Sequence, residues 1–363
     1  MKQKYRKLGD LIQPVDERNK SLVTTDVQGI SIDKEFMPSV ANTIGTDLSN
    51  YKLLRKNRFA CNPMHVGRDE RLPVSLYEKD KPAIVSPAYF MFELKNESEV
   101  LPSFLMLLFK RDNFDRNCYF RTDGSVRGGI AWNDLCELEL PVPDLAEQQR
   151  IVASYNTVDR RIRLFKQINE KLEATAQTIY RKMFVEDADE KWEVKKLGEI
   201  ADLSAGGDKP ECFSESKTEL CSVPIYSNGI DNYGLYGFTD KPKITKEAVT
   251  VSARGTIGYP CLRLEPYFPI IRLVSVIPRA ELTDAVYLYF FLKNANIVSS
   301  GTTQQQLTVP EFSETKVVVP PLKLIEQFSA KTRKLFLATK KNEAEIAQLQ
   351  NLRQLLISRI SGM

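Results

Sequence analysis

The sequence is short of the residues on which most enzymes depend. Its 363 residues include a single histidine, His65, and six cysteines, none of them in a C-x-x-C pair. One imidazole leaves histidine-based proton transfer and multi-histidine metal sites with one candidate residue. His65 stands in a polar, turn-rich segment, so a polar surface residue is the simpler interpretation. The cysteine spacing indicates free thiols in a reducing compartment, and we expect a cytoplasmic location.

Long apolar runs and nucleotide-binding motifs are absent as well. No stretch approaches the roughly 18 consecutive apolar residues of a membrane span, so no membrane association is expected. The glycine-rich segments at 206–209 and 254–258 lack the spacing of a phosphate-binding loop and are interpreted as turns. Asp144 and Glu147 fit a helix cap better than a nuclease site, since no lysine follows. The sequence therefore predicts no metal, no cofactor and no catalytic residue in this chain.

A long uninterrupted helix is the strongest positive signal. The stretch from Asp144 to Phe184 contains neither glycine nor proline. Its apolar residues recur at alternating gaps of four and three, which is the heptad pattern of a coiled coil. The expected seam of this helix includes Ile151, Val158, Ile162, Phe165, Asn169, Leu172 and Ile179. A helix with one narrow apolar stripe needs a partner helix to cover that stripe.

The same chain supplies a partner helix. Adding 177 to each seam position gives a second, weaker stripe that contains Leu335, Asn342, Ile346, Leu349 and Leu356. The same offset relates Pro143 to Pro320 and Gly124 to Gly301. We therefore interpret the chain as two copies of one unit, each a globular part followed by a long helix. We expect the helices to form an antiparallel coiled coil, in which Asn169 and Asn342 help to set the register.

Each globular part shows a mixed pattern. Lys-Leu-Gly occurs near the start of both, at Leu8-Gly9 and at Leu197-Gly198. A β-rich run and an apolar helical run follow in each part, which indicates an α+β fold with internal pseudo-two-fold duplication. The expected parts are a first globular domain at 1–143, a helix and linker at 144–187, a second globular domain at 188–320 and a helix at 321–363.

Polar loops carry the remaining chemistry. A net charge of +4 is mild, so a nucleic-acid surface would have to be local. Glutamine can bind an adenine edge with two hydrogen bonds, and arginine is the most common reader of guanine. Each of these residues, taken alone, could simply belong to a solvated surface loop. Because such loops occur at matching positions of the two copies, DNA recognition is favoured. The DNA-contact candidates are Asn62, His65, Arg68, Arg71, Arg121, Ser125, Arg127, Asn228, Arg254, Thr302, Thr303, Gln304, Gln305 and Gln306.

These motifs resemble the specificity subunit of type I DNA restriction–modification systems, over essentially the whole chain. The resemblance rests on the Lys-Leu-Gly openings and on two helix entries, ELPVPDLAEQQRIV and VVVPPLKLIEQF. It also rests on FACNPMHVGRDE, IVSPAYFMF and SVRGG in the first copy, and on PIYSNGIDNYGL and SARGTIG in the second. One departure is that Leu324-Ile325 stands in the second copy where the first has Glu147-Gln148.

The resemblance implies a non-catalytic targeting subunit. Two target-recognition domains would each read one half of a split, asymmetric sequence in double-stranded DNA, with the antiparallel helices fixing their separation. Partners would be two methyltransferase subunits, which use S-adenosylmethionine to methylate adenine, and ATP- and Mg-dependent restriction/translocase subunits. Two alternatives are a coiled-coil scaffold or adaptor that binds proteins, and a fragment of a fused methyltransferase–nuclease. The fused enzyme is disfavoured because no Asn-Pro-Pro-aromatic tetrad is present.

Overall fold

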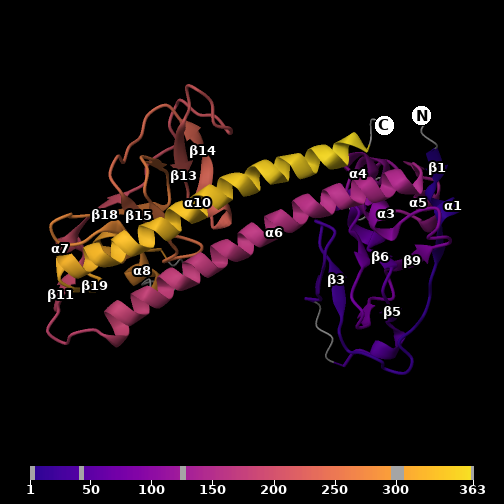
Figure 1. Ribbon diagram of the computed structural model, residues 1–363, viewed down its shortest axis with the longest axis horizontal. Coiled ribbons are helices and arrows are strands. Elements are labelled where there is room, and N and C mark those ends of the chain that lie inside the picture. The colour runs from indigo at the N-terminus through magenta and orange to yellow at the C-terminus, as the bar shows by residue number, and fades with distance from the viewer. Residues whose placement is uncertain (1–4, 41–44, 123–127, 296–305, 361–363) are drawn as a thin grey trace. The chain divides into compact units, whose positions relative to one another are not determined.

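The computed structural model describes residues 5–40, 45–122, 128–295 and 306–360. The chain forms two compact units. Unit 1 comprises Met1–Phe165 and Glu345–Met363, and unit 2 comprises Lys166–Ala344. The two long helices, α6 (Leu145–Arg181) and α10 (Leu322–Arg359), each contribute to both units (Figure 1). The four-part division expected at residues 143, 187 and 320 stays a prediction.

The core of unit 1 is a four-stranded antiparallel sheet with the order β2-β9-β6-β7. Its strands are β2 (Ile12–Pro14), β9 (Phe90–Leu94), β6 (Arg58–Cys61) and β7 (Val74–Tyr77). Helices α3 (Pro102–Phe109) and α4 (Asp112–Tyr119) pack against it. Phe59 and Phe92 stack on neighbouring strands with ring centroids 5.2 Å apart, and Phe109 meets Phe59 edge-on. The aromatic cluster holds the sheet to the helices.

The remaining elements of unit 1 are short. Antiparallel pairs join β1 (Tyr5–Lys7) to β10 (Glu139–Pro141), β3 (Gln28–Ile30) to β4 (Phe36–Pro38) and β5 (Lys52–Leu54) to β8 (Ala83–Val85). The helical segments are α1 (Leu8–Leu11), η1 (Leu48–Asn50), η2 (Pro63–His65), α2 (Val66–Asp69) and α5 (Trp132–Cys136).

Unit 2 repeats the same sheet. Its order is β12-β18-β15-β16, from β12 (Ala201–Ala205), β18 (Leu273–Pro278), β15 (Ala248–Ser252) and β16 (Pro260–Arg263). A smaller sheet has the order β14-β13-β17, from β14 (Leu235–Thr239), β13 (Val223–Tyr226) and β17 (Phe268–Pro269). The other elements are β11 (Glu193–Lys196), which pairs with β19 (Lys316–Val319), and the helical segments η3 (Lys182–Glu186), α7 (Leu197–Ile200), η4 (Asp231–Gly234), α8 (Ala285–Asn294) and α9 (Val309–Ser313).

The two Lys-Leu-Gly motifs have the same packing role. In each unit the short helix that starts with Leu-Gly lies against a second short helix that precedes the closing strand. A Cβ on Gly9 would lie 2.9 Å from the Cβ of Cys136, and one on Gly198 would lie 3.1 Å from the Cβ of Ser313. A larger residue at either position would push these helices apart. The motif therefore requires glycine because the two helices approach each other closely there. The expected α+β fold and its internal duplication are confirmed.

The long helices begin at equivalent positions, because Leu322 follows Leu145 by 177 residues (322 − 145). Gln148 and Ile325 occupy equivalent positions of the two helices. Both side chains are fully buried, although one is polar and the other apolar. Gln148 Nε2 donates to the carbonyl oxygens of Glu99 (2.9 Å) and Pro143 (2.8 Å), and its Oε1 accepts from the Leu101 N–H (2.9 Å). Ile325 instead joins the apolar core of unit 2.

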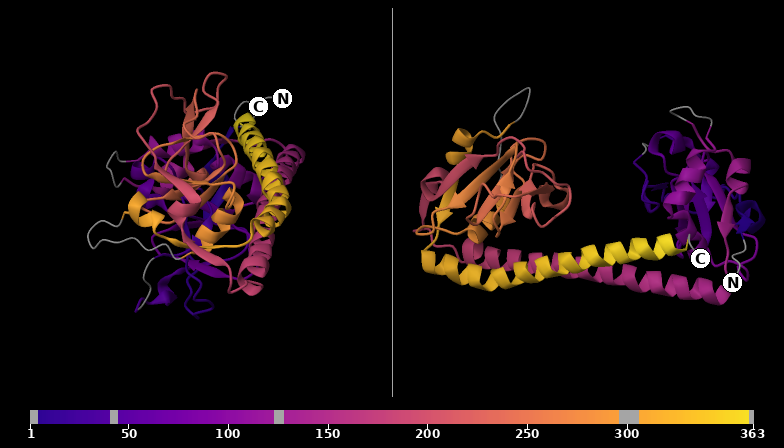
Figure 2. Two further views of the ribbon diagram at one scale, coloured as in Figure 1. Left: turned by 90° about the vertical axis from the view of Figure 1, so that its left-hand side faces the viewer. Right: turned by 90° about the horizontal axis from the view of Figure 1, so that it is seen from above.

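The helices run antiparallel within each unit. In unit 1, Val158, Ile162 and Leu349 are buried together, and Phe165, Ile346 and Leu356 pack against them. In unit 2, Asn342 Nδ2 donates to Asn169 Oδ1 at 2.7 Å, where the two helices lie side by side (Figure 2). Ile151 packs on the core of unit 1 and Ile179 and Leu335 pack on the core of unit 2, so these seam residues also contact the domains. Leu172 lines a cavity of unit 2.

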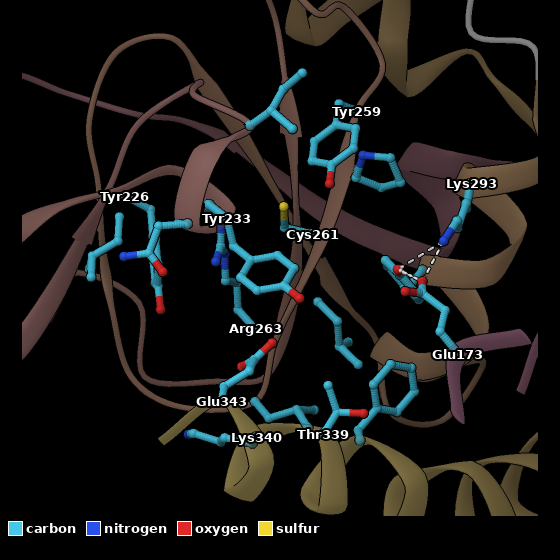
Figure 3. A pocket seen from close by; sticks show the side chains of 18 of the residues that line it. Glu173, Tyr226, Tyr233, Tyr259, Cys261, Arg263, Lys293, Thr339, Lys340 and Glu343 are labelled. Carbon is cyan, nitrogen blue, oxygen red and sulfur yellow. Dashed lines mark hydrogen bonds and ion pairs between the residues drawn. The ribbon is translucent and has the colours of Figure 1, made fainter. Parts of the chain in front are cut away.

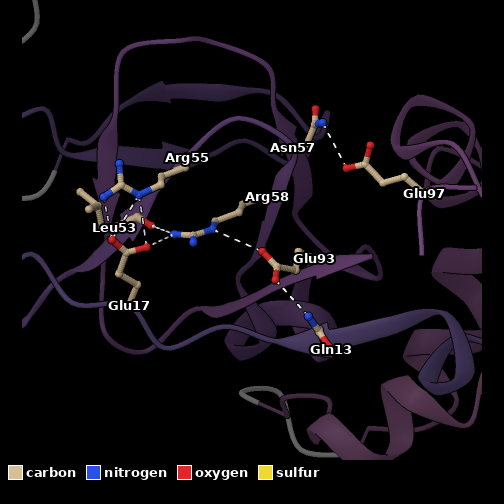
Figure 4. Close-up of polar contacts among 8 residues, drawn as sticks. All are labelled: Gln13, Glu17, Leu53, Arg55, Asn57, Arg58, Glu93 and Glu97. Atoms are coloured by element: carbon tan, nitrogen blue, oxygen red, sulfur yellow. Dashed lines mark hydrogen bonds and ion pairs between the residues drawn. The ribbon is translucent and has the colours of Figure 1, made fainter. Parts of the chain in front are cut away.

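An ion-pair network braces unit 1 (Figure 4). Glu17 accepts from Arg55 Nη2 (2.7 Å) and from Arg58 Nη1 (2.6 Å). Hydrogen bonds from Arg55, aided by Arg58, hold the pKa of Glu17 at about 2, below its ordinary value of 4.5. Arg58 Nε also lies 3.6 Å from Glu93 Oε2 on β9. The carboxylate of Glu17 therefore joins the segment that follows β2 to Arg58 at the start of β6. Arg58 in turn links this carboxylate to Glu93 on the neighbouring strand β9.

The buried Gln148 provides a stability test. Gln148→Ala would leave two carbonyl oxygens and one N–H without their partner in a site that excludes water. We expect the free energy of unfolding of the full chain to fall by about 3 kcal/mol. Gln149→Ala, at the adjacent exposed position, is the matched control and should change it by less than about 0.5 kcal/mol. Urea unfolding followed by circular dichroism measures both, and equal effects would contradict this role of Gln148.

The Glu17 network predicts a pH dependence with a definite sign. A carboxyl whose pKa is lower in the folded state stabilises that state above its unfolded pKa, and the stabilisation is lost as pH falls through the folded value. The stabilisation from Glu17 should therefore be complete at pH 6 and disappear between about pH 4.5 and 2. Glu17→Gln should destabilise the chain at pH 6 but much less near pH 2. Glu97→Gln is the control at pH 6, because Glu97 accepts only from the neutral Asn57 amide (3.2 Å), and it should destabilise the chain less than Glu17→Gln.

Candidate nucleic-acid interface

One end of the unit 2 sheet gathers loops from distant parts of the sequence. We call this the loop end; it lies where β12 and β15 finish and β18 begins. Ser252 at the end of β15 pairs with Leu273 at the start of β18. The Ala253 N–H donates to the Arg272 carbonyl (3.0 Å), and the Leu307 N–H donates to the Ala253 carbonyl (2.9 Å). The segments that follow β15, precede β18 and end at Leu307 are thus joined through backbone hydrogen bonds at this end of the sheet.

Asn228 and Arg254 are brought together at this loop end. Asn228 Nδ2 donates to the Arg254 carbonyl oxygen at 3.0 Å. The Ser252 hydroxyl donates to the Asn228 carbonyl at 3.3 Å, and Ser227 Oγ lies 3.4 Å from the Ile271 carbonyl, to which it donates. The amide of Asn228 therefore fixes the position of the loop that carries Arg254. Asn228 and Arg254 are both half-exposed.

Unit 1 has an equivalent loop end, where β6 finishes. The Ile130 N–H donates to the Pro63 carbonyl (3.2 Å), as Leu307 does to Ala253 in unit 2, and 307 − 130 again gives 177. Asn62 Oδ1 accepts from the Met64 N–H at 3.1 Å and caps a short helix. Its side chain thus has a structural role, and neighbouring residues are the better candidates for contact with a DNA base.

The cationic candidates of unit 1 differ in their surroundings. Arg68 pairs with the adjacent Asp69, with 2.7 Å between Nε and Oδ1, and is exposed. Arg71 Nη1 lies 3.7 Å from Asp33 Oδ1, and its side chain is half-exposed. Arg121 follows α4 and is exposed. Each can still offer a guanidinium to a phosphate or a base edge, because a surface ion pair contributes little and exchanges readily.

Several candidates lie outside the described residues. These are Ser125 and Arg127 in unit 1 and Thr302, Thr303, Gln304 and Gln305 in unit 2, and the side chain of His65 is likewise outside them. Gln306 is described and exposed, next to the anchored Leu307.

Sequence reasoning missed Arg272. Its carbonyl holds Ala253, and its half-exposed side chain starts from the same loop end as Arg254. Two guanidinium groups on neighbouring loops favour binding to an anionic backbone. The available signal was the single charged residue in the otherwise apolar run Ile270–Pro278.

A cavity of about 630 Å³ opens in unit 2 beside this loop end (Figure 3). Its wall includes residues 256–265, and α6, α8 and α10 contribute residues as well. Burial by itself would raise the pKa of Glu173, but hydrogen bonds from Lys293 and Tyr289 outweigh it and lower that pKa. Tyr289 donates to Glu173 at 2.8 Å. This half-exposed polar group links α8 to α6.

The described part of the chain shows no sign of a metal or membrane site. Within residues 5–40, 45–122, 128–295 and 306–360, no three His, Cys, Asp or Glu side chains converge as metal ligands do. No helix in those ranges combines the length and the apolar character needed to cross a membrane. All six cysteines are free.

Comparison with known proteins identifies relatives of this arrangement. The family model described as "Type I restriction modification DNA specificity domain" matches residues 73–174 and 189–350. A putative type I specificity subunit of Mycoplasma pneumoniae, S.MpnORF89P, is 35% identical over 136 residues, which cover 37% of this chain and 40% of that protein. A second from that organism, S.MpnORF507P, is 28% identical, with 54% of each chain covered. The chain thus spans about half the length of these two relatives.

More distant proteins match along more of their length. The specificity subunit of the type I restriction enzyme HindI from Haemophilus influenzae is 22% identical over 371 residues, with 76% of this chain and 80% of that protein covered. Among solved structures, the S subunit of a type I restriction-modification system from M. genitalium superimposes with a TM-score of 0.64 at 18% identity. That comparison covers 98% of this chain and 95% of the other, and it shows that the two share a fold.

Proposed function

Because the chain belongs to the type I restriction modification DNA specificity domain family, we propose that it is the DNA-recognition subunit of a type I restriction–modification complex. The observation that carries the proposal is the duplicated loop end. Both units present loops from the same position of the same four-stranded sheet, anchored by Ile130 in one and Leu307 in the other. The two family segments also fall largely one in each unit.

The loops of the two units differ in chemistry, which favours an asymmetric two-part target. Unit 1 offers Arg68, Arg71 and Arg121, whereas unit 2 offers Arg254, Arg272 and Gln306. A repeated scaffold with unlike side chains would read unlike half-sites, since base identity is read by the groups at the loop tips. A coiled-coil adaptor that binds proteins is not favoured, because the family match points to DNA specificity.

Catalysis would belong to partners. We expect two methyltransferase subunits that bind S-adenosylmethionine, and restriction/translocase subunits that use ATP and Mg²⁺. This chain would bind double-stranded DNA in the cytoplasm and direct adenine methylation or restriction without reacting groups of its own. The six free thiols support a reducing compartment.

Mapping of methylated adenines tests the proposal. The chain is expressed together with the methyltransferase subunits of its own system, and methylated positions are compared with those in cells that lack this chain. We expect one split, asymmetric motif that disappears without it. Methylation that is unchanged when the chain is absent would contradict the function.

Single substitutions should separate the half-sites. Arg254→Ala should reduce discrimination in one half-site only, by about 1–3 kcal/mol if its guanidinium makes two hydrogen bonds to a base. Arg121→Ala should affect only the other half-site. Arg160→Ala, on the exposed face of α6, is the matched control and should leave both unchanged. One substitution that alters both halves would contradict independent reading by the two units.

A further inference from the structure

A buried ion pair in unit 1 joins the β3–β4 hairpin to helix α4. The side chains of Lys34 and Asp115 are 5% and 11% exposed, and Lys34 Nζ donates to Asp115 Oδ1 at 2.7 Å. The same ammonium group donates to the carbonyl oxygen of Phe109, the last residue of α3, and lies 5.1 Å from the ring centroid of Phe114. Burial by itself lowers the pKa of Lys34, and the negative charge of Asp115 opposes that shift. An apolar pair of similar volume could stabilise unit 1 equally well, so the distinct property of this pair is its directed hydrogen bonding.

The hairpin holds Lys34 in a fixed position. The Ser31 N–H donates to the Glu35 carbonyl (3.0 Å), and the Lys34 N–H donates to the Ser31 carbonyl (3.0 Å). Lys34 adopts the left-handed conformation (φ 66°), which is unfavourable for a residue with a Cβ. Phe36, just after the turn, meets Tyr77 of β7 edge-on with ring centroids 5.4 Å apart. The turn and this contact together fix the start of the Lys34 side chain relative to the sheet.

Asp115 connects the hairpin to the loop end of unit 1. Its Oδ1 also accepts from the backbone N–H of Leu72 at 3.0 Å. Leu72 belongs to the segment 62–73, which joins the end of β6 to the start of β7. The Asn62 N–H donates to the Pro73 carbonyl at 2.8 Å and closes this segment at its base. One carboxylate oxygen therefore binds both a side chain of the hairpin and the backbone of the loop segment.

Arg71 lies directly beside this attachment point. It stands between Leu72 and Glu70, and Glu70 is left-handed (φ 52°). Arg71 Nη1 lies 3.7 Å from Oδ1 of Asp33, the residue that precedes Lys34 in the hairpin. The hairpin thus acts on the loop segment at two points, the backbone of Leu72 and the side chain of Arg71.

We infer that Lys34 and Asp115 are positioning residues for DNA recognition by unit 1: through the Leu72 N–H they fix the backbone from which Arg71 extends to the DNA. This inference rests on the proposed function and adds to it two buried residues that do not touch DNA. A guanidinium discriminates between bases only when its hydrogen bonds are aligned with the base edge. A shift of the Leu72 backbone would therefore reduce discrimination even if the unit stays folded.

The experiment uses the full chain in complex with its methyltransferase subunits and a library of DNA targets. Two double variants remove both charges, so that neither leaves a buried charge unpaired. Lys34→Met/Asp115→Asn keeps an amide oxygen that accepts from the Leu72 N–H, and it should discriminate as the wild type does. Lys34→Met/Asp115→Leu has no acceptor there. We expect it to lose base discrimination about tenfold, only at the positions that Arg71→Ala affects.

An exposed ion pair in the same unit provides the matched control. Lys56 Nζ lies 2.7 Å from Asp80 Oδ1, beyond the other ends of β6 and β7. Lys56→Met/Asp80→Leu makes the same substitutions there and should leave discrimination unchanged. Cooperative urea unfolding establishes that each variant is folded. Where the leucine prevents folding, Lys34→Met/Asp115→Ala also lacks the acceptor and gives the same test.

A combination with Arg71→Ala distinguishes positioning from general destabilisation. If the pair acts through Arg71, adding Arg71→Ala to Lys34→Met/Asp115→Leu should give no greater loss than Arg71→Ala alone. Additive losses, or losses in both half-sites, would overturn the inference. Equal discrimination by the Asn and Leu variants, or unchanged discrimination by Arg71→Ala, would also overturn it and leave the proposed function intact. A wild-type complex without sequence preference would instead refute the proposed function, and this inference with it.

Discussion

Everything in this molecule depends on covering the apolar stripes of two long helices. Helices of 37 and 38 residues with exposed stripes would not be stable alone in water. They cover each other where Val158 and Ile162 meet Leu349, and they cover the domain cores where Tyr155 and Phe328 are buried. Each helix is therefore part of the core of both units, and neither unit has a complete core from its globular segment alone.

Polar residues decide how that core is arranged. Asn342 bonds to Asn169 at 2.7 Å, and a slip of the helices by one heptad would leave both amides without this partner. Arg333 binds Glu247 through two hydrogen bonds of 2.7 and 2.6 Å, and Lys340 pairs with Glu265. Arg333 and Lys340 are seven residues apart and therefore lie on one face of α10. That face of α10 therefore binds the unit 2 domain through ion pairs that form only when the helix has one particular alignment with the domain. Apolar packing alone would permit several alignments.

The sequence was sufficient for features that repeat and insufficient for those that depend on single contacts. Heptad spacing predicted both helices, and the offset of 177 predicted their equivalent starts at Leu145 and Leu322. The role of Gln148 could not be predicted, because its three partners come from segments that only the fold brings together. Arg272 was missed because it directly precedes the apolar strand β18 and the run Ile270–Pro278 was interpreted as one β-rich segment. The DNA contacts expected of Asn62 and Asn228 stay a prediction, and their side-chain hydrogen bonds to neighbouring backbone could not be inferred from composition.

Strands and loops have separate roles in unit 2, so under the proposed function the chain could change its DNA target without losing its fold. At the loop end of unit 2, the contacts that fix the loops are made by backbone groups of Ala253, Arg272 and Leu307. Backbone hydrogen bonds do not depend on side-chain identity, so the residues at the loop tips can be replaced while the attachment points stay in place. Turn 227–234 is the exception, since Gly234 and Arg263 are required by its geometry. Substitutions in that turn should therefore lower stability, whereas substitutions at loop tips should leave stability unchanged and, under the proposed function, alter only the DNA sequence that is recognised.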